Sequence, residues 1–402
     1  MQRHKPWTVS AALAPLLSTT LAIMYALKIL TSPPRHRQFA FSILCVPIAH
    51  AFKHQLDLTP WFTLNDTFGR FLYIWLAHMS HAVLLVRFTP EIAQGQDSWS
   101  HRLEQAYKVL FARHPSPVPK SRRKPPHSLS RMEFCIHHLL KAALFFSISY
   151  VWDEYIDAPS SYTASSFAPA RESFIRRLPQ SFNSGEMRTR FMMTFSVCIS
   201  DMLYFSTLHS LFALVIVGIL RLDAPPDWDL SLFGTLGDCW SVRRYWGVYW
   251  HDYVHASFSA HAKVATRGWL GLRNPSAQRR GLENGIVFMF SGLMHSVVRW
   301  VQTNGEGEIW CVAVWYSAQI LPIAVEGVIH ELWMSSVVKW WLDERFGEGF
   351  MRRMERAVGY AWVFCWMFWS VPKYIHTRNS WENANLRRKY PELFASRTER
   401  LD

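Results

Sequence analysis

The stretch "NGIVFMFSGLMHSVVRW", residues 284–300, decides the class of fold. It is apolar enough to cross a bilayer, yet it contains His295. A helical rise of about 1.5 Å per residue puts His295 roughly 16 Å beyond Asn284, close to the centre of a hydrocarbon core about 30 Å thick. Because an ionisable side chain is costly at that depth, His295 is a candidate for function.

Similar apolar runs recur along the chain and predict an all-α, polytopic transmembrane bundle of about 8 spans. Only 18% of the 402 residues are charged, below the roughly 25% usual in soluble domains. Backbone groups in lipid must be satisfied within their own segment, and runs this long are helices rather than barrel strands. The expected spans are residues 9–30, 39–52, 68–88, 134–151, 191–220, 285–301, 309–333 and 359–375.

The loops between these spans carry most of the net charge of +13. Lys and Arg concentrate in cytosolic loops, so residues 302–308, which have neither, are expected in the lumen, with the protein in the endoplasmic reticulum membrane. The arginine-rich run from Arg171 to Arg190 also falls on the lumenal side, and the sequence gives no account of it. The loops expected in the cytosol are 89–133, 221–283 and 335–356.

No internal repeat divides the chain, so we expect one transmembrane domain over residues 1–402. Its motifs concentrate at residues 233–376, where Trp, His and Arg are frequent. In a soluble protein the positive charge would suggest a nucleic-acid partner. Here it reports membrane orientation, so the expected partner is the lipid bilayer and not nucleic acid.

The surroundings of His295 favour a chemical role. Ser291 and Gly292 lie one turn earlier, and small residues let another backbone or a ligand approach that face of the helix. Burial in an apolar medium disfavours imidazolium, so we expect the neutral ring that a general base requires. The alternative is a neutral histidine that only hydrogen-bonds between helices.

Other polar residues also fall within the expected spans. For Asp201 and His209, pairing between helices is the expected role, because no local pattern accompanies them. Gln319 and Glu326 are two helical turns apart, so their side chains are expected to face the same way.

An aromatic and basic segment, residues 239–280, lies between the fifth and sixth expected spans. It is too polar to cross the membrane, but its Trp and Tyr residues favour the depth of the lipid headgroups. We therefore expect an interfacial or re-entrant segment. The alternative is an amphipathic helix that lies on the membrane surface.

Histidine pairs raise the possibility of a metal site. His251 and His255 have the i, i+4 spacing that places two rings on one helix face, as do His50 and His54. Membrane di-iron enzymes gather such pairs on one side of the bilayer. Here the two pairs are expected on opposite sides, so we predict no metal site.

Together these residues resemble the wax synthase branch of the membrane-bound O-acyltransferases, and most closely its fungal acetyltransferases of secondary metabolism. That branch has an aromatic motif ending in Trp-His, a span with Ser-Gly-x-x-His, an aromatic span with Gln and an acid, and a Trp-rich last span. The corresponding residues are Arg243, Tyr245, Trp246, Gly247, Trp250 and His251, then Ser291, Gly292 and His295, then Gln319 and Glu326, then "GYAWVFCWMFWSVP".

The resemblance implies transfer of an acyl group from acyl-CoA to an alcohol, with His295 as catalytic base and His251 as the second essential residue. It implies acetyl-CoA as cosubstrate, no bound cofactor, and a lipophilic acceptor such as a terpenoid or meroterpenoid. A long-chain wax ester synthase, an ion-coupled transporter and an inactive scaffold are the alternatives. The residues expected to bind substrate or CoA are Arg243, Arg244, Trp246, Trp250, Ser291, Gln319 and Glu326.

Overall fold

The structure is a computed structural model, in which every regular element of the described residues is a helix. It describes residues 7–90, 98–110, 129–157, 166, 168–228, 231–250, 255–305 and 308–389. The chain divides into two compact units. Unit 1 is Met1–Pro117 with Tyr253–Ser317, and unit 2 is Val118–Asp252 with Ala318–Asp402. The expected single domain over the full chain stays a prediction.

The prediction of a helical membrane protein is confirmed by helices that are long and apolar enough to cross a membrane. By length and composition there are four of them in the described residues, and each coincides with an expected span. The other expected spans are also helical, but the total of about 8 and the re-entrant segment stay predictions. The four helices are Val9–Thr31, Arg131–Ile156, Ser184–Ile219 and Trp310–Met334.

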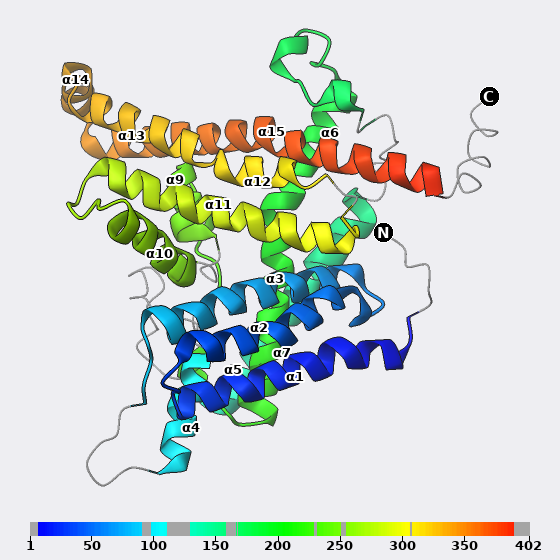
Figure 1. The fold of residues 1–402 in the computed structure, drawn as a ribbon. Helices are drawn as coiled ribbons and strands as arrows, with labels where there is room; N and C mark the ends of the chain where they lie inside the picture. The colour runs from blue at the N-terminus through cyan, green and yellow to red at the C-terminus, as the bar shows by residue number, and fades with distance from the viewer. Residues whose placement is uncertain are drawn as a thin grey trace. The chain divides into compact units, whose positions relative to one another are not determined.

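Unit 1 is built from the first four α-helices of the chain together with three later ones (Figure 1). Two of the later helices carry His295 and Tyr316. Its α-helices are α1 (Val9–Thr31), α2 (Arg37–Lys53), α3 (Phe62–Ser80), α4 (Trp99–Leu110), α10 (His255–Lys263), α11 (Ala277–Gln302) and α12 (Trp310–Ser317). Shorter turns are η1 (Gln55–Asp57), η2 (His81–Leu85) and η13 (Val264–Trp269).

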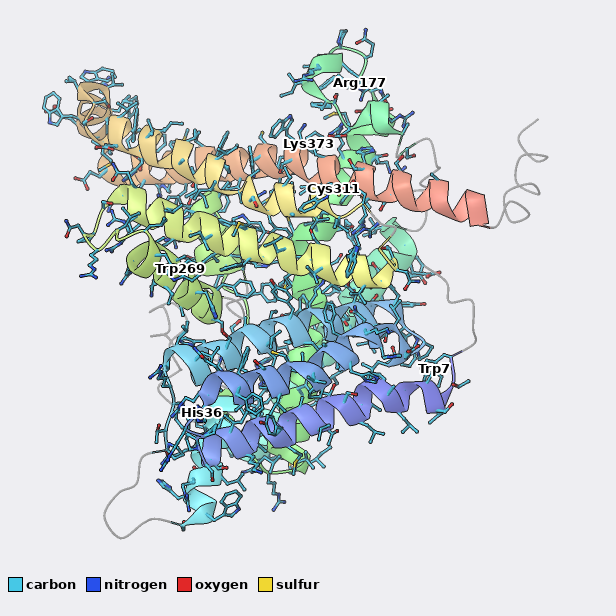
Figure 2. The ribbon with its side chains drawn as sticks, viewed as in Figure 1. Trp7, His36, Arg177, Trp269, Cys311 and Lys373 are labelled. Atoms are coloured by element: carbon cyan, nitrogen blue, oxygen red, sulfur yellow. The ribbon has the colours of Figure 1, made fainter. Side chains whose placement is uncertain are left out.

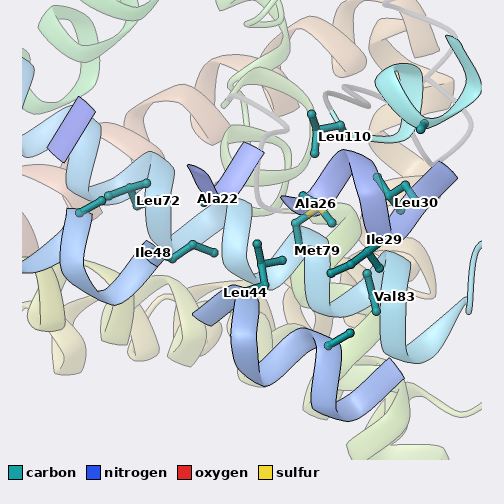
Figure 3. Close-up of a cluster of buried hydrophobic side chains, with 13 residues drawn as sticks. Ala22, Ala26, Ile29, Leu30, Leu44, Ile48, Leu72, Met79, Val83 and Leu110 are labelled. Atoms are coloured by element: carbon teal, nitrogen blue, oxygen red, sulfur yellow. The ribbon is translucent and has the colours of Figure 1, made fainter. Parts of the chain in front are cut away.

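A hydrophobic cluster holds α1 to α4 together (Figure 3). Ala22 and Ala26 of α1 are fully buried, and Leu44 of α2 and Met79 of α3 pack into the same cluster. Small residues let helix backbones approach closely, which is how helices associate where lipid removes the hydrophobic driving force. The outward faces of these helices stay apolar, as with Leu17 and Met24, which is the pattern expected of a surface covered by lipid.

Unit 2 contains the aromatic segment and the last, longest helix. Its α-helices are α5 (Arg131–Val151), α6 (Ser184–Phe195), α7 (Asp201–Ala213), α8 (Pro225–Trp228), α9 (Val242–Arg244), α13 (Ile320–Met334), α14 (Val337–Phe346) and α15 (Glu348–Lys389). The π-helical turns η9 (Ser196–Ser200) and η10 (Leu214–Ile219) extend α6 and α7. The remaining short elements are η4 (Trp152–Asp157), η7 (Pro169–Arg171), η8 (Ile175–Arg177), η11 (Leu236–Asp238) and η12 (Tyr245–Tyr249).

The arginine-rich run from Arg171 to Arg190 has a structural explanation in unit 2. Arg190 is fully buried, and its Nε donates to Glu186 over 3.1 Å. Arg177, labelled in Figure 2 on the segment before α6, donates to the same carboxylate over 2.5 Å. Arg190 also lies 4.8 Å above the ring of Phe174 and donates to the carbonyl of Arg171. Part of the run therefore stabilises its own loop.

Histidines bring α5 and α7 together in unit 2. The ring Nδ1 of His138 lies 3.2 Å from the hydroxyl of Ser210, and its ring centroid lies 5.9 Å from that of His209. His209 also lies 5.3 Å from the ring of Trp228. This arrangement agrees with the packing role expected of His209.

Candidate functional site

His295 lies on α11 of unit 1 and is half-buried. Its ring stacks on that of Tyr316 from α12, with the centroids 4.6 Å apart and the planes at 10°. Such near-parallel stacking restricts rotation of the imidazole about its side-chain bonds. The stack therefore holds the plane of the imidazole, in which both ring nitrogens lie.

The small residues before His295 serve the contact between α11 and α12. A Cβ on Gly292 would lie 2.8 Å from both the Cα and the carbonyl oxygen of Ala313, closer than real Cβ atoms approach. Ser291 is also buried. The sequence left open whether a helix backbone or a ligand approaches this face of α11. In the structure the backbone of α12 lies against Gly292. That close contact sets the distance between His295 and Tyr316.

Two side chains, one just before α13 and one within it, accept hydrogen bonds from residues 242–246 of the aromatic segment. The first is Gln319, which is fully buried. Its Oε1 accepts a hydrogen bond from the indole N–H of Trp246 over 3.2 Å and another from that of Trp366 over 3.0 Å. One amide oxygen thus joins α13, η12 and α15.

The second acceptor is Glu326, whose carboxylate lies at the start of the helix that begins at Val242. It accepts from the backbone N–H groups of Val242 and Arg243 and from the indole of Trp362, the last over 2.9 Å. A negative charge at a helix N-terminus satisfies free N–H groups and favours the helix dipole. These contacts place Glu326 at the start of that helix, and its expected contact with substrate stays a prediction. We call Gln319 and Glu326, with their five donor residues, the polar seam; the donors are Val242, Arg243, Trp246, Trp362 and Trp366.

The polar seam agrees with the expected orientation of Gln319 and Glu326. Trp362 and Trp366 are one turn apart on α15, and each binds one of the two acceptors. The two acceptors therefore face the same way. The sequence predicted a Trp-rich last span but did not single out these two tryptophans. The i, i+4 spacing of Trp362 and Trp366 was the sequence pattern that could have singled them out.

The two adjacent arginines have different environments. Arg244 donates to the carboxylate of Asp238 over 2.6 Å and lies 4.9 Å above the ring of Trp240. Burial alone would raise the pKa of Asp238, but hydrogen bonds from Thr235 and Arg244 lower it overall, so the ion pair is intact at neutral pH. Arg243 is exposed, and no carboxylate of the described residues forms an ion pair with it. Arg243 is thus the arginine that remains for an anionic ligand.

Further rings of the aromatic segment, up to Trp250, pack against one another in unit 2. Trp250 is buried, and its ring stacks on Tyr245 at 5.6 Å and meets Trp246 at 5.4 Å. His251 lies outside the described residues. Burial raises the pKa of the nearby Cys239 thiol to about 12, so this thiol stays protonated and is a poor nucleophile.

The predicted site residues thus form two groups, each described within its own unit. His295, Ser291 and Gly292 belong to unit 1, whereas the polar seam and the arginines belong to unit 2. The described residues contain no cluster of three or more His, Cys, Asp or Glu side chains suited to a metal ion.

Replacing Gln319 by Met tests the polar seam. Met matches the length of Gln but has no strong acceptor, so the indoles of Trp246 and Trp366 lose their bond to Gln319. We expect unfolding to become easier by about 1–3 kcal/mol, seen as a lower melting temperature in detergent. The same change at exposed Gln278 on α11 is the matched control and should leave the melting temperature unchanged. Equal effects at the two positions would contradict the role of Gln319.

Comparison with known proteins finds a family match over part of the chain. Residues 228–317 match the model of the Membrane bound O-acyl transferase family. No solved structure matches the chain.

Several curated relatives are fungal acetyltransferases. Acetyltransferase nanB of Aspergillus nanangensis is 25% identical over 50% of this chain and 45% of its own length. Acetyltransferase aurG of Calcarisporium arbuscula is 28% identical over 43% of this chain and 40% of its own. Acetyltransferase atnC of an Arthrinium species is 26% identical, over 44% and 38%.

The chain spans less than half the length of these curated relatives. The match with the family model includes Arg243, Trp246 and His295 but ends before Gln319. The predicted resemblance is therefore confirmed, to the membrane-bound O-acyltransferases over residues 228–317 and to fungal acetyltransferases over about half of the chain.

Proposed function

We propose that the protein is a multi-pass O-acyltransferase of the endoplasmic reticulum that moves acetyl from acetyl-CoA to a hydroxyl of a terpenoid or meroterpenoid. The observation that carries the proposal is the half-buried imidazole of His295, held by Tyr316 on a helix expected to span the membrane. The names of the fungal relatives support acetyl as the group transferred.

In the proposed reaction His295 removes the proton of the acceptor hydroxyl as its oxygen attacks the thioester carbon. The tetrahedral oxyanion then collapses, breaks the carbon–sulfur bond and expels CoA thiolate, which takes the proton back from the imidazolium. We assign the oxyanion contact to His251. The indole N–H of Trp246 is donated to Gln319, so we assign Trp246 a positioning role in place of the substrate contact expected from the sequence.

The CoA phosphates require a cation at the cytosolic end of the site, and Arg243 is our candidate because it is exposed. Replacing Arg243 by Ala should raise the KM for acetyl-CoA about 10-fold, as expected from the loss of one charge-assisted contact, with little change in kcat. Replacing Arg244 by Ala should instead lower the melting temperature, because Asp238 loses its partner. An unchanged KM in the Arg243 variant would remove that residue from the CoA site.

Purified protein in detergent tests the function directly. Incubation with acetyl-CoA and a panel of terpenoid alcohols should release free CoA and form acetate esters without any ion gradient. Activity only with palmitoyl-CoA and hexadecanol would favour the wax ester synthase instead. Absence of CoA release from well-folded protein, with transport in a gradient-bearing vesicle, would favour the transporter.

A further inference from the structure

Unit 2 contains an apolar cavity of about 180 Å³. It lies where α6 and η9 face α15 and the segment η11–η12. Its floor is buried, with Tyr249 at 1% and Met367 at 2% exposure. Three large apolar residues at its margin, Phe191, Leu236 and Phe364, are exposed, so the cavity opens to the surface there.

Three hydroxyl groups of the lining are hydrogen-bonded to backbone carbonyls. The hydroxyl of Thr194 donates to the carbonyl of Arg190 over 2.8 Å. The hydroxyl of Tyr360 donates to the carbonyl of Gly237 over 2.7 Å, and that of Tyr249 donates to a carbonyl of η9 over 3.4 Å. The lining therefore presents rings and methyl groups, and a charged or strongly hydrogen-bonding ligand would lose its hydration without compensation.

The size of the cavity limits what it can hold. A dry cavity of about 150 Å³ takes one benzene ring, so this one suits a single ring or a branched isoprenoid unit. The open margin includes Phe191, which belongs to the candidate span Ser184–Ile219. A lipophilic molecule dissolved in the bilayer can therefore reach the margin without crossing water.

The cavity adjoins the polar seam through one helical turn. Tyr245 and Tyr249 of η12 line the cavity, while Trp246 of the same turn donates to Gln319. A ligand in the cavity would thus contact the aromatic motif of the proposed active site.

We propose that this cavity binds an uncharged hydrocarbon group of the acceptor alcohol and selects acceptors by the size of that group. The inference rests on the proposed acyltransferase function and adds to it a location for acceptor selection. Acetyl-CoA, which is polar along most of its length, is excluded from the cavity by the apolar lining.

Blocking the margin tests the inference. Leu236→Trp adds a ring at an exposed lining position and should raise the KM for farnesol about 10-fold, as expected when an apolar pocket loses part of its volume. The KM for acetyl-CoA should not change. Leu222→Trp, at an equally exposed leucine outside the lining, is the matched control. Phe364→Ala should widen the cavity and favour bulkier alcohols over farnesol.

A labelling experiment gives a readout that does not need turnover. A farnesol analogue bearing a diazirine should label residues of α6, η9 or α15 in the wild type, and excess farnesol should suppress that labelling. Leu236→Trp should reduce labelling and Leu222→Trp should not.

The two assays separate the possible failures. Acetyl transfer with labelling elsewhere, with labelling that farnesol does not suppress, or with equal kinetics in the two Trp variants would overturn the acceptor cavity. Suppressible labelling without any CoA release would overturn the proposed function, and the assignment of the ligand as an acceptor with it.

Discussion

Replacing His295 by Ala is expected to lower kcat for acetyl transfer by roughly 100- to 10,000-fold, the range for loss of a general base. Without the imidazole no group in the stack with Tyr316 can accept the proton of the acceptor hydroxyl. The protein should still fold, because the change removes a half-buried ring and leaves the contact at Gly292 intact. Ester formation from labelled acetyl-CoA measures the effect.

His330→Ala is the matched control for that experiment. His330 lies on α13 and is exposed, so its loss should leave turnover within about twofold and stability within about 0.5 kcal/mol. Normal turnover in the His295 variant, in protein that elutes from a sizing column like the wild type, would eliminate the base mechanism. Loss of folded protein in the His295 variant alone would instead assign the ring a packing role, the alternative considered at the start.

Most helices of the fold could be predicted because lipid imposes a strong constraint on sequence. A run such as Val9–Thr31 has no way to satisfy its backbone except as a helix. The number of spans is harder to predict. α2 is only 17 residues long, and α15, at 42 residues, extends well beyond its apolar part. Hydropathy alone therefore predicts that the protein is helical better than it predicts which helices cross the membrane.

The sequence singled out candidate site residues but not their contacts. Glu326 was expected to bind substrate, which stays a prediction; its partners in the structure include the backbone N–H groups of Val242 and Arg243, and a backbone partner leaves no trace in residue identity. Arg243 and Arg244 look equivalent in the sequence. They differ because only Arg244 reaches Asp238, across a turn that no periodicity reveals. In both cases tertiary contacts decide the partners.

Replacing Gly292 by Leu is expected to cause the second large effect. Even a Cβ at this position would lie 2.8 Å from the backbone of Ala313, and backbone cannot move aside as a flexible side chain can. We expect a loss of more than about 3 kcal/mol of stability, the upper end for overpacking. Because α12 would be pushed from α11, Tyr316 should also leave its stack on His295, and turnover should fall in any protein that remains folded.

Gly285→Leu is the matched control, because it lies on the same helix and a Cβ there would meet no atom within 4 Å. It should change stability by no more than about 0.5 kcal/mol and leave turnover unchanged. Melting temperatures in detergent and acetyl transfer should both be measured for the two variants. Equal losses of stability in the two variants would mean that α11 accepts a larger side chain at neither position. The contact between Gly292 and Ala313 would then not explain the effect. A large loss of stability and turnover at Gly292 alone would show that the spacing of α11 and α12 places the ring of His295.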